Sequence, residues 1–221
     1  MEQKDIIEPR ECYFKTFQEI LTIGGNTEGP LTVIGSGEIV DLIFDRIKVQ
    51  NVNFQHSIIL KRIQFNNDVV FKDCHFKSKT QFIDVKFNTI VIFENCTGVE
   101  SIEFVNCNYD DFQFSSGTYK NIRFLGTNGE SRIGINHLKF DNSTIQSLEL
   151  KCKDIYSSIE FNGGNIDDLF IGRTQLHGFV LFNNTFNCKS FTTEANAFKG
   201  RLDFYESSFG NIYFRKVGSV I

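Results

Sequence analysis

The chain has 221 residues, of which 23 are basic and 27 acidic, so the formal net charge is only −4 at pH 7. This balance excludes the strongly basic surface that direct nucleic-acid binding needs. The aromatic residues are skewed, with 25 Phe, one Met and no Trp, and this indicates that Phe fills one recurring position of a repeat.

No segment has the uninterrupted apolar core of a signal peptide or the length of a membrane span. We therefore expect a cytoplasmic protein that does not associate with membranes. The six cysteines lack the paired spacing of a zinc site and are predicted to be buried thiols: Cys12, Cys74, Cys96, Cys107, Cys152 and Cys188. No cofactor is expected.

Residues 1–30 differ from the rest of the chain. Apolar residues such as Phe14, Phe17 and Leu21 recur at helical spacing, which predicts an amphipathic helix over residues 9–22, followed by a loop to residue 30. Such a helix would cap the open first coil of a repeat structure. A partner-binding helix is the alternative.

From Leu42 onward a unit of ten or eleven residues repeats, with the form aliphatic, x, Phe, x, x, small, x, bulky. Five copies read VVFKDCHF from Val69, IEFVNCNY from Ile102, LKFDNSTI from Leu138, IEFNGGNI from Ile159 and LDFYESSF from Leu202. In each half-unit the bulky residue and the residue two before it share one face of a short extended segment. The aromatic ladder from Phe65 to Phe124 is therefore predicted to point inward as core, against the alternative of an exposed recognition strip. Cys74 and Cys96, one coil apart, are predicted to stack inside as thiols.

Residues two positions past the bulky slot favour tight bends, since Asn, Asp and Gly tolerate left-handed backbone conformations. They are Asn67, Asp73, Asp84, Asn95, Asn106, Asn142, Gly163 and Asn184. A turn every five or six residues makes the chain coil, with each face stacked on the same face of the next coil at about 4.8 Å.

These five-residue half-units, with a bulky centre and a small or aliphatic residue two before it, resemble the pentapeptide-repeat proteins over residues 42–214. The resemblance implies an all-β solenoid, namely a right-handed quadrilateral parallel β-helix with four half-units per coil. About thirty half-units predict seven or eight coils, preceded by the short N-terminal capping helix. Because some steps are six residues long, a three-sided parallel β-helix remains the alternative.

We expect one continuous domain. It comprises the cap and loop (1–30), a first β-helix block (31–124), an interruption (125–137) and a second block (138–221). The interruption, with its three glycines, is predicted to be a loop or a neutral insertion, and as a recognition loop it would present Asn128, Glu130 and Arg132.

The chain after the last repeat is too short for a capping helix, so the final coil is expected to expose a strand edge and apolar side chains. That end would favour a homodimer or a protein partner. Its candidate binding residues are Arg215, Lys216, Val217, Val220 and Ile221.

No catalytic constellation is evident, because the four histidines, His56, His75, His137 and His177, form no cluster with ligands or a plausible nucleophile, and Cys74 beside His75 is predicted to be a core thiol. The chain is therefore predicted not to be an enzyme.

The leading hypothesis is a scaffold or adaptor that binds another protein through its sides, the 125–137 loop or its uncapped C-terminal end. The resemblance also implies an alternative, a DNA mimic that binds a type II topoisomerase. A self-assembling structural rod is the third hypothesis.

Overall fold

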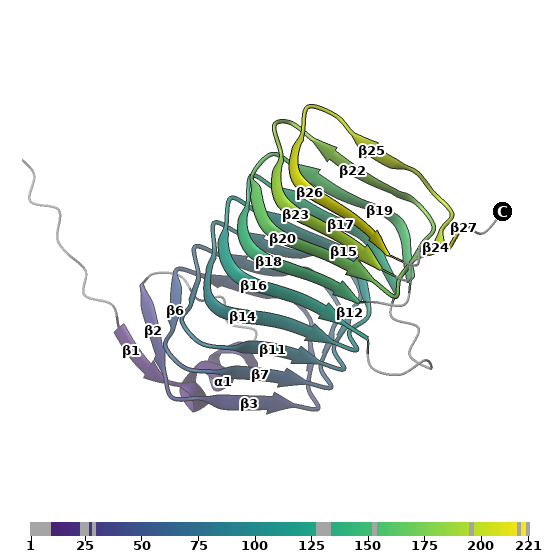
Figure 1. Cartoon of the computed structure of the whole chain (residues 1–221). Coiled ribbons are helices and arrows are strands. Elements are labelled where there is room, and N and C mark those ends of the chain that lie inside the picture. The colour runs from purple at the N-terminus through teal and green to yellow at the C-terminus, as the bar shows by residue number, and fades with distance from the viewer. Residues whose placement is uncertain are drawn as a thin grey trace, which may run out of the picture.

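The computed structural model shows parallel strands stacked as a β-solenoid of about nine turns, with one short helix at its start (Figure 1). It describes residues 10–22, 27, 30–126, 134–151, 154–194, 197–215 and 218–219. The predicted parallel β-helix with an N-terminal helix is confirmed.

The strands form four faces, and in the early turns each face has a strand of its own. The first face holds β1 (Arg10–Tyr13), β2 (Leu31–Ile34), β6 (Val52–Phe54) and β10 (His75–Phe76). The second holds β3 (Gly37–Val40), β7 (Ile58–Lys61) and β11 (Thr80–Ile83). The third holds β4 (Ile43–Phe44), β8 (Gln64–Phe65) and β12 (Lys86–Phe87). The fourth holds β5 (Ile47–Gln50), β9 (Val69–Lys72) and β13 (Val91–Glu94).

In later turns single strands bend around a corner and serve two faces. The first and second faces continue in β14 (Thr97–Val105), β16 (Thr118–Leu125), β18 (Thr144–Lys151), β20 (Asn165–Gly172), β23 (Asn187–Glu194) and β26 (Ser208–Arg215). The third and fourth continue in β15 (Tyr109–Ser115), β17 (Gly134–Asp141) and β19 (Asp154–Asn162). Beyond these, the third face has β21 (Gln175–Leu176), β24 (Ala197–Phe198) and β27 (Gly218–Ser219), and the fourth has β22 (Phe179–Asn183) and β25 (Leu202–Phe204).

The strand register decides the number of sides. β10 pairs with β6, β11 with β7, β12 with β8 and β13 with β9, so four successive strands complete one turn before the pattern repeats. The coil is four-sided, and the three-sided alternative is wrong. The predicted count of seven or eight coils was also too low, since the stacking already begins with β1 and β2, before the first recognisable repeat.

The N-terminal helix is shorter than predicted. α1 spans Phe14–Thr22, whereas Arg10–Tyr13 extends as β1 and pairs with β2. The helix caps the first turn as expected: Phe17 is buried and its ring lies 5.3 Å from that of Phe54. Gly37 makes room for the helix, because a Cβ there would lie 1.8 Å from the ring of Phe14.

Two corners of each turn carry the left-handed residues that the sequence predicts. Of the eight expected positions, seven have positive φ, namely Asp73, Asp84, Asn95, Asn106, Asn142, Gly163 and Asn184, and Asn67 does not. Some corner side chains also form hydrogen bonds to the neighbouring turn. For example, Asn95 Nδ2 donates to Asp73 Oδ1 of the preceding turn at 2.6 Å.

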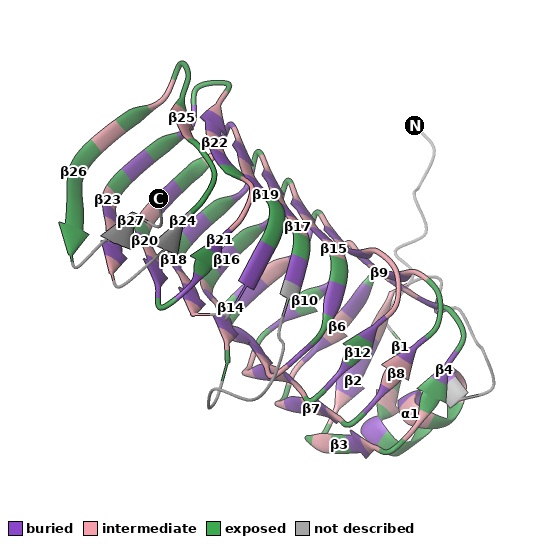
Figure 2. Ribbon diagram, turned by 90° about the vertical axis from the view of Figure 1, so that its right-hand side faces the viewer, coloured by how far each residue is buried: buried purple, intermediate pink, exposed green. Residues whose placement is uncertain are grey.

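The core consists of stacked side chains on each face. The longest ladder follows the fourth face, with ring centroids 4.8–5.2 Å apart along Phe71, Phe93, Phe114, Phe140, Phe161, Phe182 and Phe204. Every aromatic residue of the Phe65–Phe124 ladder is buried, and Figure 2 shows the alternation of buried and outward positions along the strands. The exposed-strip alternative is therefore wrong.

The interruption is accommodated within one enlarged turn. Phe93 pairs with Phe114, 21 positions later, but Phe114 pairs with Phe140, 26 positions later. β16 ends at Leu125 and β17 starts at Gly134, so both edges of the predicted 125–137 segment belong to regular strands.

Candidate protein-interaction surfaces

The last turn, formed by β25 and β26, exposes side chains that are buried in every earlier turn. Phe204 stacks on Phe182 at 5.2 Å, yet it is 45% exposed whereas Phe182 is fully buried. Ile212 and Phe214 pair with Phe191 and Thr193 of the turn below and are 41% and 57% exposed. These core positions are open because no described residue stacks above them.

The backbone of this turn is open on the same side. β26 pairs with β23, and no other strand of the described chain lies beside it. Unpaired N–H and C=O groups along an edge strand are a template for pairing with another chain. We call β25, β26 and their exposed core-position side chains Phe204, Ile212 and Phe214 the open end.

The structure places one of the predicted C-terminal residues at this end. Arg215 is exposed at the last position of β26, with its guanidinium carbon 6.0 Å from the ring centroid of Tyr213. Lys216, Val217, Val220 and Ile221 lie outside the described residues. The predicted loop residues Asn128, Glu130 and Arg132 also lie outside them, so these predictions remain untested.

The second face carries a ladder of ion pairs that sequence reasoning missed. Glu103 Oε2 lies 2.9 Å from Lys79 Nζ, and Arg123 bridges Glu103 Oε1 at 3.4 Å and Glu149 Oε2 at 2.7 Å. Lys151 contacts Glu149 from the other side. The sequence does contain charged residues about one turn apart. Which of them lie side by side, however, depends on the strand register.

Both carboxyl groups of this ladder titrate below their ordinary range. Burial raises the pKa of Glu103, but hydrogen bonding and attraction from Lys79, with help from Gln81 and Arg123, outweigh it and lower the pKa. Burial likewise raises the pKa of Glu149, and Lys151 and Arg123 lower it overall. The ladder therefore holds its charges fixed on the surface at neutral pH.

The prediction of buried thiols is confirmed for Cys74, Cys96, Cys107 and Cys188, whereas Cys12 is half-buried. Cys74 and Cys96 are free and fully buried, and their Sγ atoms donate to the carbonyls of Val49 at 3.4 Å and Phe71 at 3.3 Å. Cys107 repeats the arrangement, and burial raises the pKa of its thiol to about 12. These three thiols occupy the small position of the repeat and belong to the core.

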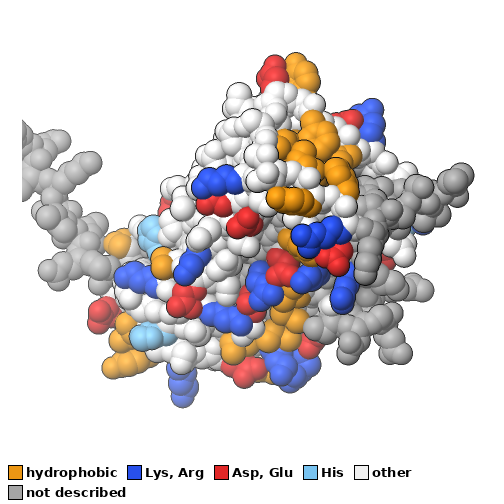
Figure 3. All heavy atoms as spheres, in the orientation of Figure 1, with side chains coloured by type: hydrophobic (Ala, Val, Ile, Leu, Met, Phe, Trp, Pro, Cys, Tyr) orange, Lys and Arg blue, Asp and Glu red, His pale blue; other side chains and the backbone are white. Residues whose placement is uncertain are grey.

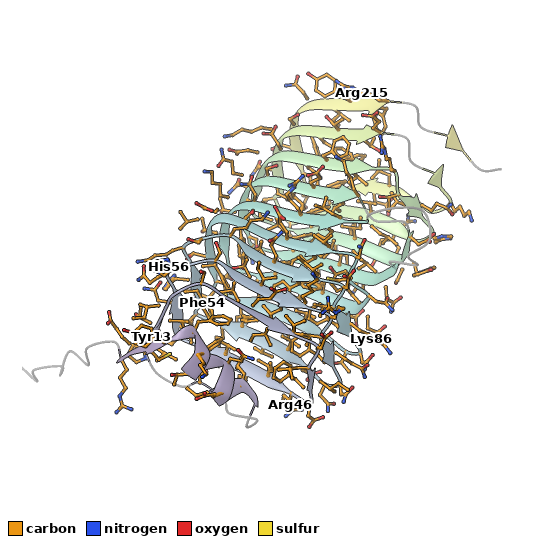
Figure 4. All side chains as sticks on the ribbon, turned by 90° about the horizontal axis from the view of Figure 1, so that it is seen from below. Tyr13, Arg46, Phe54, His56, Lys86 and Arg215 are labelled. Carbon is orange, nitrogen blue, oxygen red and sulfur yellow. The ribbon has the colours of Figure 1, made fainter. Side chains whose placement is uncertain are left out.

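The histidines lie apart on the outside of the coil. His75 Nδ1 is 2.8 Å from Thr97 Oγ1, His137 Nε2 is 3.3 Å from Glu160 Oε1, and His177 Nε2 is 2.8 Å from Asp154 Oδ1. His56 is exposed, and Figure 4 shows it at the rim. In the part of the chain that the structure describes, no group of three or more His, Cys, Asp or Glu side chains is placed to hold a metal ion.

The comparisons with known proteins were negative: no protein-family model, curated protein or solved structure matches this chain. The resemblance to pentapeptide-repeat proteins thus remains a prediction from the repeat. Among the described residues, no helix combines the length and apolar character needed to cross a membrane.

Proposed function

We propose that the protein is a non-enzymatic scaffold that binds other protein chains, and that the open end is its main docking surface. The observation that carries this proposal is the contrast between Phe204, Ile212 and Phe214, which are 41–57% exposed, and their buried counterparts one turn below. Contiguous apolar surface of this kind favours association, because contact removes it from water.

A second copy of the chain fits this end. The straight segment Asn211–Arg215 of β26 would pair antiparallel with itself about Tyr213, which places Ile212 opposite Phe214 and Asn211 opposite Arg215. No like charges meet in this register, and the core-position side chains of both copies stay on the same side of the joined sheet. The expected product is a homodimer joined end to end.

The alternative functions receive less support. A DNA mimic would present rows of acidic side chains, but basic and acidic residues are interspersed on the face that Figure 3 shows, and the ladder on the second face alternates in sign. A two-ended filament would need a free N-terminal turn, and α1 covers that turn.

Light scattering coupled to gel filtration tests the proposal. The unaltered protein is expected to elute as a dimer of the 25.4 kDa chain, and the double variant Ile212→Lys/Phe214→Lys as a folded monomer, because charge on the edge prevents strand pairing. Ile43→Lys is the matched control, since Ile43 is 70% exposed but lies on β4.

A protein that is monomeric at high concentration would refute the dimer. The wider scaffold proposal would then depend on partner capture with the intact chain, the lysine variant and a deletion of residues 127–133. If both variants retained the same partners as the intact chain, neither the open end nor the interruption would be the docking surface.

A further inference from the structure

Two rows of inward positions run along the second face from the first turn to the last. One row begins at Gly37 and ends at Ile212, and the other begins at Ile39 and ends at Phe214. We call the cross-section at either end of the coil its mouth. The same two rows therefore end beneath a helix at one mouth and uncovered at the other.

At the first turn α1 supplies the cover. Its buried residues Phe14, Phe17 and Leu21 are spaced i, i+3 and i+7, so they form one apolar stripe along the helix. Figure 4 shows α1 across the start of the coil, close to Phe54. Ile39, at the start of its row, is only 1% exposed. One amphipathic helix is therefore enough to bury this core position.

The helix covers this mouth without pairing to a strand. β3 pairs with β7, and no other strand of the described chain lies beside it. α1 contacts β1, β2 and β3, and the ring of Phe17 lies 5.3 Å from that of Phe54 on the first face. A helix therefore spans two faces of the coil, whereas a strand added to an edge extends only one.

Apolar side chains from three faces surround the mouth at the open end. Phe209 of the first face packs edge-on against Phe204 of the fourth face, with ring centroids 5.1 Å apart. Ile212 and Phe214 add exposed apolar surface from the second face. Figure 3 shows hydrophobic side chains gathered at this end of the molecule. This surface extends across the mouth, as the surface beneath α1 does.

We propose that a partner protein docks on the open end through an amphipathic helix that lies across the mouth, as α1 does at the other end. This inference rests on the proposed function, because it uses the same docking surface, and it adds the kind of partner. The helix and a second copy of the chain cover the same residues and exclude each other. Partner binding should therefore separate the dimer.

One difference between the two mouths specifies the partner helix. At the first turn Gly37 leaves room for Phe14, because a Cβ on that glycine would lie 1.8 Å from the ring. The same row ends in Ile212 at the open end, so a phenylalanine cannot sit equally deep there. We expect leucine or a smaller apolar residue at this position of the partner helix, with further apolar residues at i+3 and i+7.

Fluorescence anisotropy with the full chain tests the proposal. The probe is a labelled peptide in which residues 14–22, with Phe14→Leu, stand between alanine-rich helical turns, because such a short segment alone is a marginal helix in water. The control peptide carries Phe17→Ser and Leu21→Ser in addition. The probe should bind, and the control peptide should bind at least about tenfold more weakly, since its apolar stripe is lost.

Variants of the chain locate the binding. Ile212→Lys/Phe214→Lys should weaken binding of the probe by about tenfold or more, because a bound helix would take the lysine ammonium groups out of water. Ile43→Lys, on β4, should leave it unchanged. The proposal is overturned if the double variant binds the probe as tightly as the unaltered chain, if both peptides bind equally, or if neither binds at millimolar concentration.

Light scattering separates this inference from the proposed dimer. Excess probe should convert the dimer to one chain with one peptide, and a dimer that binds the probe without a change in the number of chains would contradict the competition. A chain that is monomeric without peptide but binds the probe would refute the dimer and support the helix site. A dimer that does not bind the probe would do the reverse.

Discussion

The two ends of the solenoid present the same kind of surface and differ in what covers it. At the N-terminal end α1 places Phe14, Phe17 and Leu21 over the first turn, and all three are buried. At the other end Ile212 and Phe214 are exposed, although they occupy the same face of the coil as buried residues below.

This difference shows that, in a repeat fold, the neighbouring turn determines whether an inward side chain is buried. A terminal turn lacks one of its two neighbours, so its inward side chains and one backbone edge stay open unless another element covers them. The helix supplies that cover for the first turn. At the last turn an element from another chain is the proposed cover.

The largest expected effect comes from breaking the covered end. Phe17→Ala removes a buried ring that packs edge-on against Phe54 at 5.3 Å, so the free energy of unfolding should fall by about 3–5 kcal/mol. Phe214→Ala, at the open end, should change it by less than about 1 kcal/mol in dilute protein. Urea unfolding of both variants measures the contrast, and equal losses would contradict it.

A smaller effect is expected near the open end, at a strained corner. Thr185 has φ of 62°, a left-handed conformation that is unfavourable for a β-branched residue. Thr185→Gly should raise the unfolding free energy by about 0.5–1 kcal/mol. The neighbouring Asn184→Gly should gain less, because asparagine tolerates this conformation. The same unfolding measurement checks both, and a loss of stability in Thr185→Gly would show that the corner is unstrained.

The smallest expected effect concerns the ion pairs in the middle of the solenoid and the pH dependence of the unfolding free energy. The pKa of Glu103 is lowered in the fold from its ordinary value of 4.5, so the stabilisation is complete above pH 4.5 and is lost as pH falls through the folded pKa. Thermal unfolding between pH 6 and pH 3 should show this loss, and Glu103→Gln should reduce it. An unchanged pH dependence in the variant would place the acid sensitivity elsewhere.

Much of the fold follows from the sequence because the repeat is local. The bulky residue and the small residue two before it determine which face is inward, and Asn or Asp two positions later determines the bend. These rules predict the Phe65–Phe124 ladder in the core, as the structure shows, and seven of the eight corner positions that they predict have positive φ. Other left-handed residues, such as Arg62, Ser116 and Arg173, were not predicted. The helix prediction failed at Arg10–Tyr13, where helical spacing of apolar residues continues but pairing with β2 offers the backbone a strand partner.

The candidate surfaces were predicted less completely. The open end was expected from the short tail, but the exposed side chains that form it, Phe204, Ile212 and Phe214, look like ordinary core positions in the sequence. The ion-pair ladder of Glu103, Arg123 and Glu149 needs the register of three turns, and one of these turns is lengthened to 26 residues.

The sequence by itself determined the coil: alternating side-chain faces, tight corners and a Phe-filled interior are properties of segments five or six residues long. Only the tertiary structure decided which of those faces remain accessible. Accessibility depends on the turn above, the turn below and the register between them, and those contacts join residues about 21 to 26 positions apart. The same inward phenylalanine is therefore core at Phe182 and part of a docking surface at Phe204.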